Sequence, residues 1–251
     1  LGPGMSELAA PAKLVAARLK AWPIPGVEQH YADKDTLLYA LGLGLGAEVV
    51  DAGNLPFLHE RGLKVMPTLA LMLGYPGPWM NDPATGIDFL RLVHGEQRLR
   101  LHRPLPPAGT VCSRSRVTHL VDKGADKGAV MVVERTLTLQ DSAAGNPLLA
   151  SMQQVLFLRG NGGFSASGPS SDAALPPLPA APQSPPTHVV DVRTPPNLAL
   201  IYRLSGDMNP LHADPEVARR AGFERPLLHG LATFGIAAHA VIEACCGVEP
   251  A

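Results

Sequence analysis

Four long segments rich in Val, Leu and Thr, with roughly alternating polar and apolar residues, occupy the middle of the chain. They are Arg98–Leu105, Thr110–Asp122, Val130–Gln140 and Leu148–Leu158. Short stretches that contain Pro, Gly, Asp or Asn separate them, and this punctuation predicts antiparallel strands joined by tight connections. A strand as long as Thr110–Asp122 also predicts a sheet that curves around another element of the fold.

Apolar periodicity before this strand meander predicts the other elements of the first half. A helix is expected where apolar residues recur at helical spacing, and Pro or Gly marks where it begins or ends. The predicted elements are a helix within Met5–Trp22, a short strand at Val27–Tyr31, a helix at Asp33–Leu43, a helix after Pro67 within Leu63–Tyr75, and a short helix or turn at Gly86–Val93.

The segment Gly160–Thr187 differs from both sides of the chain. It contains seven prolines between Pro169 and Pro186, among Ala and Ser residues. Such a composition predicts an extended, poorly packed linker. We therefore expect an N-terminal unit over residues 5–164, a linker over residues 165–187 and a C-terminal unit over residues 188–251, in which Val189–Val192 supplies one strand.

The composition excludes several classes of function. Hydrophobic residues make up 46% of the 251 residues and the formal net charge is -1, so we expect a packed core and no nucleic-acid partner. Cys112, Cys245 and Cys246 form no disulfide framework and favour a reducing compartment. The longest uncharged apolar stretch, Pro226–Ile242, is shorter than the roughly 20 residues of a membrane span. It is predicted to be a buried helix, and no membrane partner is expected.

One segment, Tyr202–Ala218, places reactive side chains on a short turn between two predicted helices. The apolar run before the turn ends at Gly206, because glycine tolerates the left-handed backbone found at helix ends. Asn209-Pro210 then forces an extended or turn conformation. Asp214-Pro215 provides the cap and the first residue of a second helix. Asp207–His212 is therefore predicted to be a fixed loop.

Asp207 and His212 on this loop suit the activation of a water molecule. A carboxylate and a neutral imidazole can share the protons of one water, and histidine titrates close to neutral pH. Two other interpretations remain open from the residues alone. Asp207 could bond backbone N–H groups while His212 lies at the surface, or a zinc or iron ion could bind Asp207, His212 and Asp214. No further ligand is placed by a motif, and we expect no metal.

The whole segment Tyr202–Ala218 resembles the motif of the (R)-specific enoyl-CoA hydratases, the MaoC-like or hydratase 2 family. That motif is Tyr/Phe-x-Leu-Ser-Gly-Asp-x-Asn-Pro-Leu-His, followed after five residues by a small residue, and every position is occupied here. The resemblance implies an α+β double hotdog fold, in which each of two curved antiparallel sheets wraps one central helix. It also implies a hydro-lyase that converts trans-2-enoyl-CoA to (3R)-3-hydroxyacyl-CoA, with no cofactor.

The same resemblance assigns the catalytic residues. Asp207 and His212 hold the water, and Asn209 orients that water or the Asp207 carboxylate. Gly230 lies at the start of the predicted central helix His229–Ala244, where free backbone N–H groups favour negative charge. Its N–H is expected to stabilise the enolate oxygen of the substrate. A purely structural role for Gly230, in packing the helix on a sheet, is also compatible with the residues.

Two segments of the N-terminal unit resemble family elements that contact the CoA part of the substrate. One contains His94 and Gly95, and the other is a turn around Lys123, where a lysine suits a phosphate. Without the resemblance, Lys123 would be interpreted as a solvated hairpin lysine. The remaining predicted substrate-binding residues lie in the catalytic loop and are Met208, Pro210 and Leu211.

The two halves of the chain contain a degenerate internal repeat. Tyr39–Gly44 aligns with Tyr202–Asp207, and Met66–Ala70 aligns with Leu228–Ala232, at almost the same spacing. We interpret this as a duplicated unit whose first copy lost its acid, since Gly44 stands where Asp207 stands. In the family the first copy is not catalytic and accommodates the acyl chain.

The C-terminal copy departs from the family pattern, because no strands are predicted after its central helix. The second hotdog is therefore expected to be truncated at its C-terminal strands. This departure leaves open a non-catalytic acyl-CoA-binding or assembly protein, whereas a hotdog thioesterase would lack the Asp207–His212 motif. A homodimer is compatible with the sequence. We expect a cytoplasmic protein if the source is bacterial, or a peroxisomal one if it is eukaryotic, although no Ser-Lys-Leu tripeptide follows Cys246.

Overall fold

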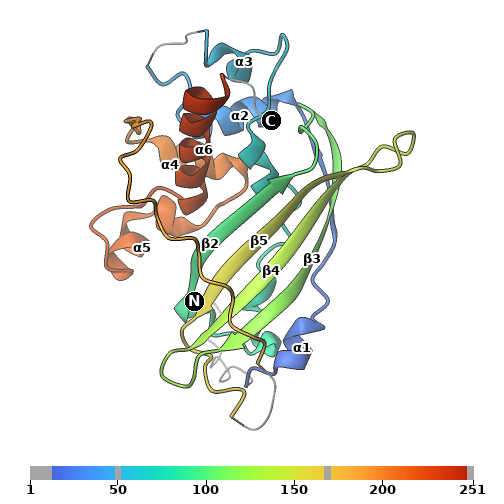
Figure 1. The fold of residues 1–251 in the computed structure, drawn as a ribbon, viewed down its shortest axis with the longest axis vertical. Helices are drawn as coiled ribbons and strands as arrows, with labels where there is room; N and C mark the ends of the chain where they lie inside the picture. Colours follow the sequence, from blue (N-terminus) through green and yellow to red (C-terminus); the bar gives the residue numbers. More distant parts are fainter. Residues whose placement is uncertain (1–12, 49–51, 167–170, 248–251) are drawn as a thin grey trace, which may run out of the picture.

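A sheet of five antiparallel strands forms the centre of the computed structural model, which describes residues 13–48, 52–166 and 171–247 (Figure 1). The strands lie in the order β1-β3-β4-β5-β2, and each pairs antiparallel with its neighbour. Their bounds are Val27–Tyr31 for β1, Leu92–Leu101 for β2, Gly109–Asp122 for β3, Ala129–Leu139 for β4 and Leu148–Leu158 for β5.

Most helices gather at one end of this sheet, next to β2, as Figure 1 shows for α2, α3, α4 and α6. The α-helices are α1 (Ala16–Lys20), α2 (Asp33–Gly42), α3 (Leu55–Leu58), α4 (Leu198–Tyr202), α5 (Pro215–Arg220) and α6 (Gly230–Cys246). Short 3-10 helices are η1 (Pro67–Leu71), η2 (Trp79–Asn81), η3 (Pro83–Thr85), η4 (Phe89–Arg91), η5 (Arg203–Ser205) and η6 (Pro210–His212). None of the helices in the described ranges is both long and apolar enough to cross a membrane.

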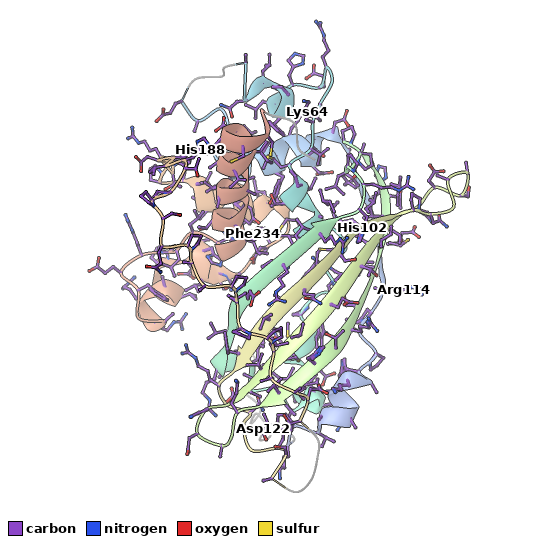
Figure 2. The ribbon with its side chains drawn as sticks, in the orientation of Figure 1. Lys64, His102, Arg114, Asp122, His188 and Phe234 are labelled. Carbon is purple, nitrogen blue, oxygen red and sulfur yellow. The ribbon has the colours of Figure 1, made fainter. Side chains whose placement is uncertain are left out.

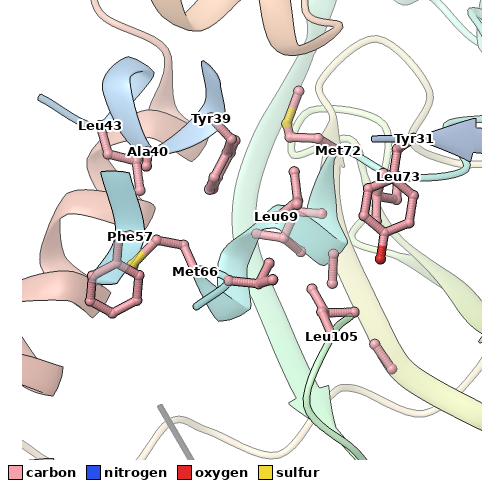
Figure 3. Close-up of a cluster of buried hydrophobic side chains, with 14 of the residues drawn as sticks. Tyr31, Tyr39, Ala40, Leu43, Phe57, Met66, Leu69, Met72, Leu73 and Leu105 are labelled. Carbon is pink, nitrogen blue, oxygen red and sulfur yellow. The ribbon is translucent and has the colours of Figure 1, made fainter. Parts of the chain in front are cut away.

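The main hydrophobic core lies between the helices and one face of the sheet, which we call the inner face. Tyr39 of α2, Leu69 of η1 and Ile236 of α6 belong to the same buried cluster as Leu137 of β4. Figure 3 shows part of this cluster, including Tyr39, Leu43 and Phe57 around η1. Because the apolar side of α6 packs on η1 and α2, the helix that carries Gly230 is held by the first half of the chain.

The predicted strand meander is confirmed, with one displaced boundary. β3, β4 and β5 begin and end within one residue of the predicted segments. β2 instead begins at Leu92, six residues before the predicted start at Arg98, and includes residues that we had assigned to a helix or turn. The sequence pattern missed this part because a bulge between His94 and Glu96 interrupts the alternation of the strand.

Three other expectations were wrong or only partly met. The apolar segment Leu63–Tyr75 forms the five-residue 3-10 helix η1 rather than a full central helix, and Gly74, with φ at +63°, redirects the chain after it. Val189–Val192 forms no strand, because no strand edge lies beside it to complete a ladder. Within Met5–Trp22 the structure has a helix only at Ala16–Lys20, and residues 5–12 lie outside the described ranges.

The predicted linker has no regular secondary structure in its described part, but it is tied to the sheet. Asp122 at the end of β3 accepts hydrogen bonds from the backbone N–H groups of Gly163 and Ser165 at 2.7 Å each. Further along, the Asp172 carboxylate accepts from the Leu120 N–H at 2.7 Å and pairs with Lys20 at 2.5 Å. The linker therefore pairs with the edge of β3 near Leu120, whereas its proline content predicted a poorly packed segment.

The internal repeat has a structural counterpart. The aligned residues Tyr39 and Tyr202 are both fully buried, and their ring centroids lie 5.8 Å apart. Helix α2 approaches α4 so closely that a Cβ atom on Gly42 would lie 3.0 Å from the Cα of Tyr202. Contact between equivalent positions is what an approximate two-fold axis between two copies produces. The packing supports the interpretation of a duplicated unit.

The two copies differ in how their central helices are covered. Within the described ranges, all five strands lie between Val27 and Leu158, and none follows α6. The 17-residue helix α6 therefore has no sheet formed by the described residues of its own half. Val241, for example, remains 58% exposed on its surface.

Candidate active site

The loop from Gly206 to Asp214 is fixed at both ends by the devices that the sequence predicts. Gly206 adopts φ at +125° where η5 ends, a conformation that side chains other than glycine rarely take. The Asp214 carboxylate accepts hydrogen bonds from the N–H groups of Glu216 and Val217, which caps α5. Between them, Pro210 opens the 3-10 turn η6. The prediction of a fixed loop between two helices is confirmed.

Asp207 is half-buried at the start of this loop. Its Oδ1 accepts a hydrogen bond from the N–H of Asn209 at 3.2 Å, so the side chain also helps to shape the turn. Asp207 therefore does bond a backbone N–H group, as one of the interpretations from sequence expected. One carboxylate oxygen suffices for this bond, and a carboxylate has lone pairs on both oxygens for a second partner.

His212 is oriented by a single backbone contact. Its Nδ1 lies 2.9 Å from the carbonyl oxygen of Leu227, and because a carbonyl only accepts, Nδ1 carries the proton. This tautomer leaves Nε2 with a lone pair. Potential ligand atoms of Asp207, His212 and His229 all lie within 4.8 Å of one another, so the structure brings the two predicted residues to one place.

His229 is a member of this cluster to which the sequence analysis gave no role. It is only 1% exposed, and its ring stacks on that of His212 with centroids 3.7 Å apart. Its Nε2 lies 3.1 Å from the backbone oxygen of Asp207, whereas its buried Nδ1 has no hydrogen-bond partner. Burial lowers the pKa of His229, and the neighbouring His212 lowers it further. A neutral His229 thus joins the acid loop to the imidazole of His212.

The signal that could have found His229 was present in the sequence. His229 directly precedes Gly230 at the start of the apolar helix, where a buried polar residue needs a partner. The sequence could not show that this partner is the backbone of Asp207, 22 residues away. The two meet through tertiary packing, in which the His229 ring lies against the ring of Tyr202 with centroids 4.9 Å apart.

Asp207, His212 and His229 also resemble a set of metal ligands, but their geometry does not favour binding of a metal ion. Asp214, the ligand considered from sequence, is occupied in capping α5. His229 takes its place in the cluster, yet the rings of His212 and His229 are stacked with only 27° between their planes. An imidazole binds a metal along a lone pair in the plane of its ring. The two stacked rings hold their lone pairs in separate, nearly parallel planes, so an ion close to both rings does not lie in the plane of each.

The other predicted residues of the loop are exposed or half-buried around the dyad. Asn209 uses its Oδ1 to accept the N–H of Leu211 at 3.0 Å, so its carbonyl group is engaged in the turn. Met208 is 55% exposed, and Pro210 is also exposed. Leu211 is half-buried, and its backbone oxygen accepts a hydrogen bond from the N–H of Leu227 at 3.4 Å. This bond holds the loop against the segment that precedes α6.

Gly230 is the first residue of α6 and is exposed. A Cβ atom built on it would meet no other heavy atom within 4 Å, so open space lies beside this backbone. The first N–H groups of a helix have no acceptor within the helix. The helix therefore presents free donors to a space next to His229, and this arrangement suits an oxyanion.

In the N-terminal unit, Gly95 is the unpaired residue of the β2 bulge, and His94 directly precedes it. His94 contacts the side chain of Gln154 and the backbone oxygen of Glu96. Desolvation lowers the pKa of His94, and this outweighs the hydrogen bonds with Glu96 and Gln97 and the charge of Asp207, which raise it. The Phe157 ring lies against Gly95 so closely that any side chain at this position would overlap it.

Lys123 lies apart from this group. It follows Asp122 in the turn between β3 and β4, where its N–H donates to Gly128 at 2.9 Å. Figure 2 places Asp122 at the end of the sheet farthest from Phe234 of α6. Of the sequence-predicted residues, the structure brings Asp207 and His212 together, and Gly230 directly follows His229 of the same cluster, whereas Lys123 lies at the far end of the sheet.

Comparison with known proteins agrees with the duplicated architecture. Residues 29–160 match the family of the MFE-2 hydratase 2 N-terminal domain, and residues 178–249 match the MaoC like domain. The chain is 38% identical over 247 residues to the peroxisomal enoyl-CoA hydratase 2 of Arabidopsis thaliana, covering 92% of this chain and 77% of that protein. It is 37% identical over 227 residues to the enoyl-CoA hydratase ChsH3 of Mycobacterium tuberculosis, covering 88% and 75%.

A solved structure confirms the fold. The MaoC-like dehydratase from Phytophthora capsici superposes with a TM-score of 0.78 at 30% identity, over 94% of this chain and 80% of that one. The α+β architecture, with an antiparallel sheet and a packed helix, is therefore the hotdog type expected from the motif. With matches of this extent over both halves, the chain belongs to the MaoC-like family, in its hydratase 2 branch.

Proposed function

We propose that the chain adds water across the double bond of trans-2-enoyl-CoA to give (3R)-3-hydroxyacyl-CoA, and catalyses the reverse dehydration at the same site. The observation that carries the proposal is the convergence of the Asp207 carboxylate and the His212 imidazole beside His229, which directly precedes α6. The chain is a hydro-lyase by its family, and its relatives include several enoyl-CoA hydratases.

In the proposed mechanism Asp207 and His212 hold one water by its two protons. The water oxygen bonds to Cβ as the π bond of the alkene breaks, and the electron pair moves onto the thioester oxygen as an enolate. A proton then returns from the dyad to Cα, so that the elements of one water are added on one face. The Gly230 N–H donates to the enolate oxygen as charge develops there. The open space beside Gly230 supports this role.

Substrate binding is proposed to involve both copies. His94 and Gly95 line the site from β2, and Met208, Pro210 and Leu211 line it from the catalytic loop. Asn209 positions the loop through its bond to Leu211, and this adds to the role in water orientation expected from sequence. An assignment of Lys123 to CoA requires the nucleotide end of the substrate to reach the far turn of the sheet.

The test is the hydration of crotonyl-CoA, followed by loss of absorbance at the enoyl-thioester band. Asp207→Asn and His212→Gln keep the shape of each side chain, and each should lower kcat by roughly 100-fold or more, the scale of a lost general acid or base. His102→Gln provides a matched control, because His102 lies exposed near the end of β2, where it contacts Ser151. Near-normal turnover by either dyad variant, or a 3S product by chiral chromatography, would contradict the mechanism.

A second function is compatible with the exposed apolar surface of α6, on which Val241 is 58% exposed. A non-catalytic acyl-CoA-binding or assembly protein would need a binding site for the acyl-CoA but no activated water molecule. Binding of saturated acyl-CoA without turnover of any enoyl-CoA, over several chain lengths, would favour it. We also expect a homodimer, which sedimentation would report as twice 26.4 kDa. Relatives include proteins named as peroxisomal, and location in that organelle is proposed for a eukaryotic source.

A further inference from the structure

On the inner face of the sheet, one charged residue, Arg135, lies between two apolar clusters. On β4, Leu137 belongs to the main core under the helices, whereas Met131 and Val133 belong to a second cluster near α1. Arg135 lies between them on the same face, opposite Ser115 of β3. Because strand residues alternate between faces, Arg135 points toward the space between the sheet and the first copy's 3-10 helix.

Arg135 is inserted into this space with few partners. One terminal nitrogen donates to the backbone oxygen of Leu71 at 2.5 Å and lies 3.5 Å from the sulfur of Met152. Its Nε is enclosed and has no hydrogen-bond partner. Leu71 ends η1, so part of the role of Arg135 is to satisfy a carbonyl at a helix end.

That structural role does not account for the charge. Among the described residues, none forms an ion pair with Arg135, and burial lowers the pKa of its guanidinium to about 10. Removing a charge from water without pairing it is costly, so buried guanidinium groups normally face a carboxylate or phosphate. A neutral side chain of similar size could have filled the same space between the two apolar clusters at less cost.

The segment after η1 joins Arg135 to the candidate active site. Met72 accepts a hydrogen bond from the Tyr202 hydroxyl at 3.2 Å and lies next to Gly206. Gly74 is fixed on the sheet, where its carbonyl accepts from Ser113 at 2.6 Å. Tyr75 follows directly, and its pKa is raised by desolvation and by Asp207, and lowered by Arg135. Leu71, which accepts the hydrogen bond from Arg135, thus directly precedes Met72, which contacts Gly206.

We propose that Arg135 forms a subsite for a carboxylate at the far end of the acyl chain, so that the chain accepts enoyl thioesters of dicarboxylic acids. The proposal rests on the hydratase function above, which places the reacting carbons at Asp207. A carboxylate suits a guanidinium because the two groups match in charge and in planar, two-bond geometry. The subsite lies in the first copy, which has lost its own acid.

The test compares pairs of substrates that differ only at the far end: trans-2-enoyl-CoA and the corresponding enedioyl-CoA with a terminal carboxylate, over acyl lengths of six to sixteen carbons. For the wild-type protein, at least one length should give a higher kcat/KM with the carboxylate than with its methyl ester. Arg135→Met should remove that preference, by roughly 10- to 100-fold for the loss of one charged hydrogen-bonded contact. The ratio of kcat/KM between the two substrates of a pair measures the preference separately from any loss of total activity in the variant.

Two controls separate this subsite from a general effect of charge or folding. Arg114→Met removes an exposed arginine on the opposite face of the sheet, labelled in Figure 2, and should leave the preference intact. Arg135→Lys keeps the charge and should restore part of the preference if the methionine variant folds poorly. Calorimetric binding of the saturated dioyl-CoA and acyl-CoA to wild-type protein adds a readout without turnover.

The outcomes distinguish the two proposals. Turnover of uncharged enoyl-CoA with no preference for a carboxylate at any length, in both turnover and binding, would overturn the subsite while leaving the hydratase. Turnover of neither substrate class would overturn the proposed hydratase and the substrate class together. A preference that survives Arg135→Met would place carboxylate recognition elsewhere and reject Arg135 as its residue.

Discussion

Asp122→Asn should weaken the attachment of the linker to the sheet. The Asp122 carboxylate accepts four hydrogen bonds, from the N–H of Gly124 at 2.8 Å, from the N–H of Gly163 at 2.7 Å, and from the N–H and hydroxyl of Ser165 at 2.7 Å each. Three of the four come from the segment where the N-terminal unit passes into the linker. An amide has only one acceptor oxygen, so it cannot keep this set.

The size of the effect follows from the pKa of Asp122. Desolvation raises this pKa, but the hydrogen bonds with Ser165, Gly163 and Gly124 outweigh it and hold the pKa at about 2, against an ordinary 3.8. A pKa lowered from 3.8 to about 2 corresponds to roughly 2 kcal/mol, and screening by solvent at this partly exposed group reduces the stabilisation to about 1 kcal/mol. Since the folded-state pKa is the lower one, this stabilisation is present above about pH 3.8 and is lost as the pH falls toward 2.

Urea unfolding of the wild-type and Asp122→Asn proteins, followed by tryptophan fluorescence between pH 7 and pH 3, measures this difference. We expect the variant to be about 1 kcal/mol less stable at pH 7, with the gap narrowing below about pH 4. Protease should also cleave the variant faster within residues 165–187. Asp126→Asn, in the same turn, is the control, because Asp126 is exposed and makes no such set of bonds. The reasoning would be refuted if both variants lost the same free energy of unfolding relative to wild type, or if the loss in Asp122→Asn did not change with pH.

Two further predictions concern the packing of the two copies. Gly42→Ala should lower stability by about 1–3 kcal/mol, measured as a lower melting temperature, because its Cβ would lie 3.0 Å from the Cα of Tyr202; an unchanged melting temperature would show that α2 and α4 separate easily. His229→Phe keeps an aromatic ring against His212 but loses the bond to the Asp207 backbone. It should lower kcat by roughly 10-fold with little change in KM, as for one lost hydrogen bond that positions the dyad. Unchanged kcat would assign His229 to packing alone.

Local chemistry made much of the fold predictable. The strands β3, β4 and β5 alternate cleanly between turns, and Asp214 with Pro215 marks the start of α5 in the expected way. Gly206 ends the preceding helix because the loop needs its positive φ. Each of these features depends on residues within a few positions of one another, and sequence patterns record such short-range requirements directly.

Long-range contacts explain what the sequence did not show. The strand at Leu92 depends on pairing with Leu158, and the bulge beside His94 hides its alternation. Asp172 binds β3 through backbone groups 52 positions away, so its proline-rich surroundings gave no sign of it. His229 and Arg135 are ordinary residues in their own segments and acquire their roles only from what packs on them. The candidate site was thus predictable in its loop but not in its buried surroundings.

The duplication gives the copy without the acid a mechanical role in catalysis. Gly44 stands where Asp207 stands, so the first copy cannot hold a water in the same way. Its Met72 nevertheless accepts the Tyr202 hydroxyl and lies against Gly206, the residue just before Asp207. Because Tyr39 and Tyr202 meet near the approximate two-fold axis, the position of the acid loop is set by the first copy. The first copy therefore still supports the second site after the loss of its own acid, and we propose that it also accommodates the acyl chain.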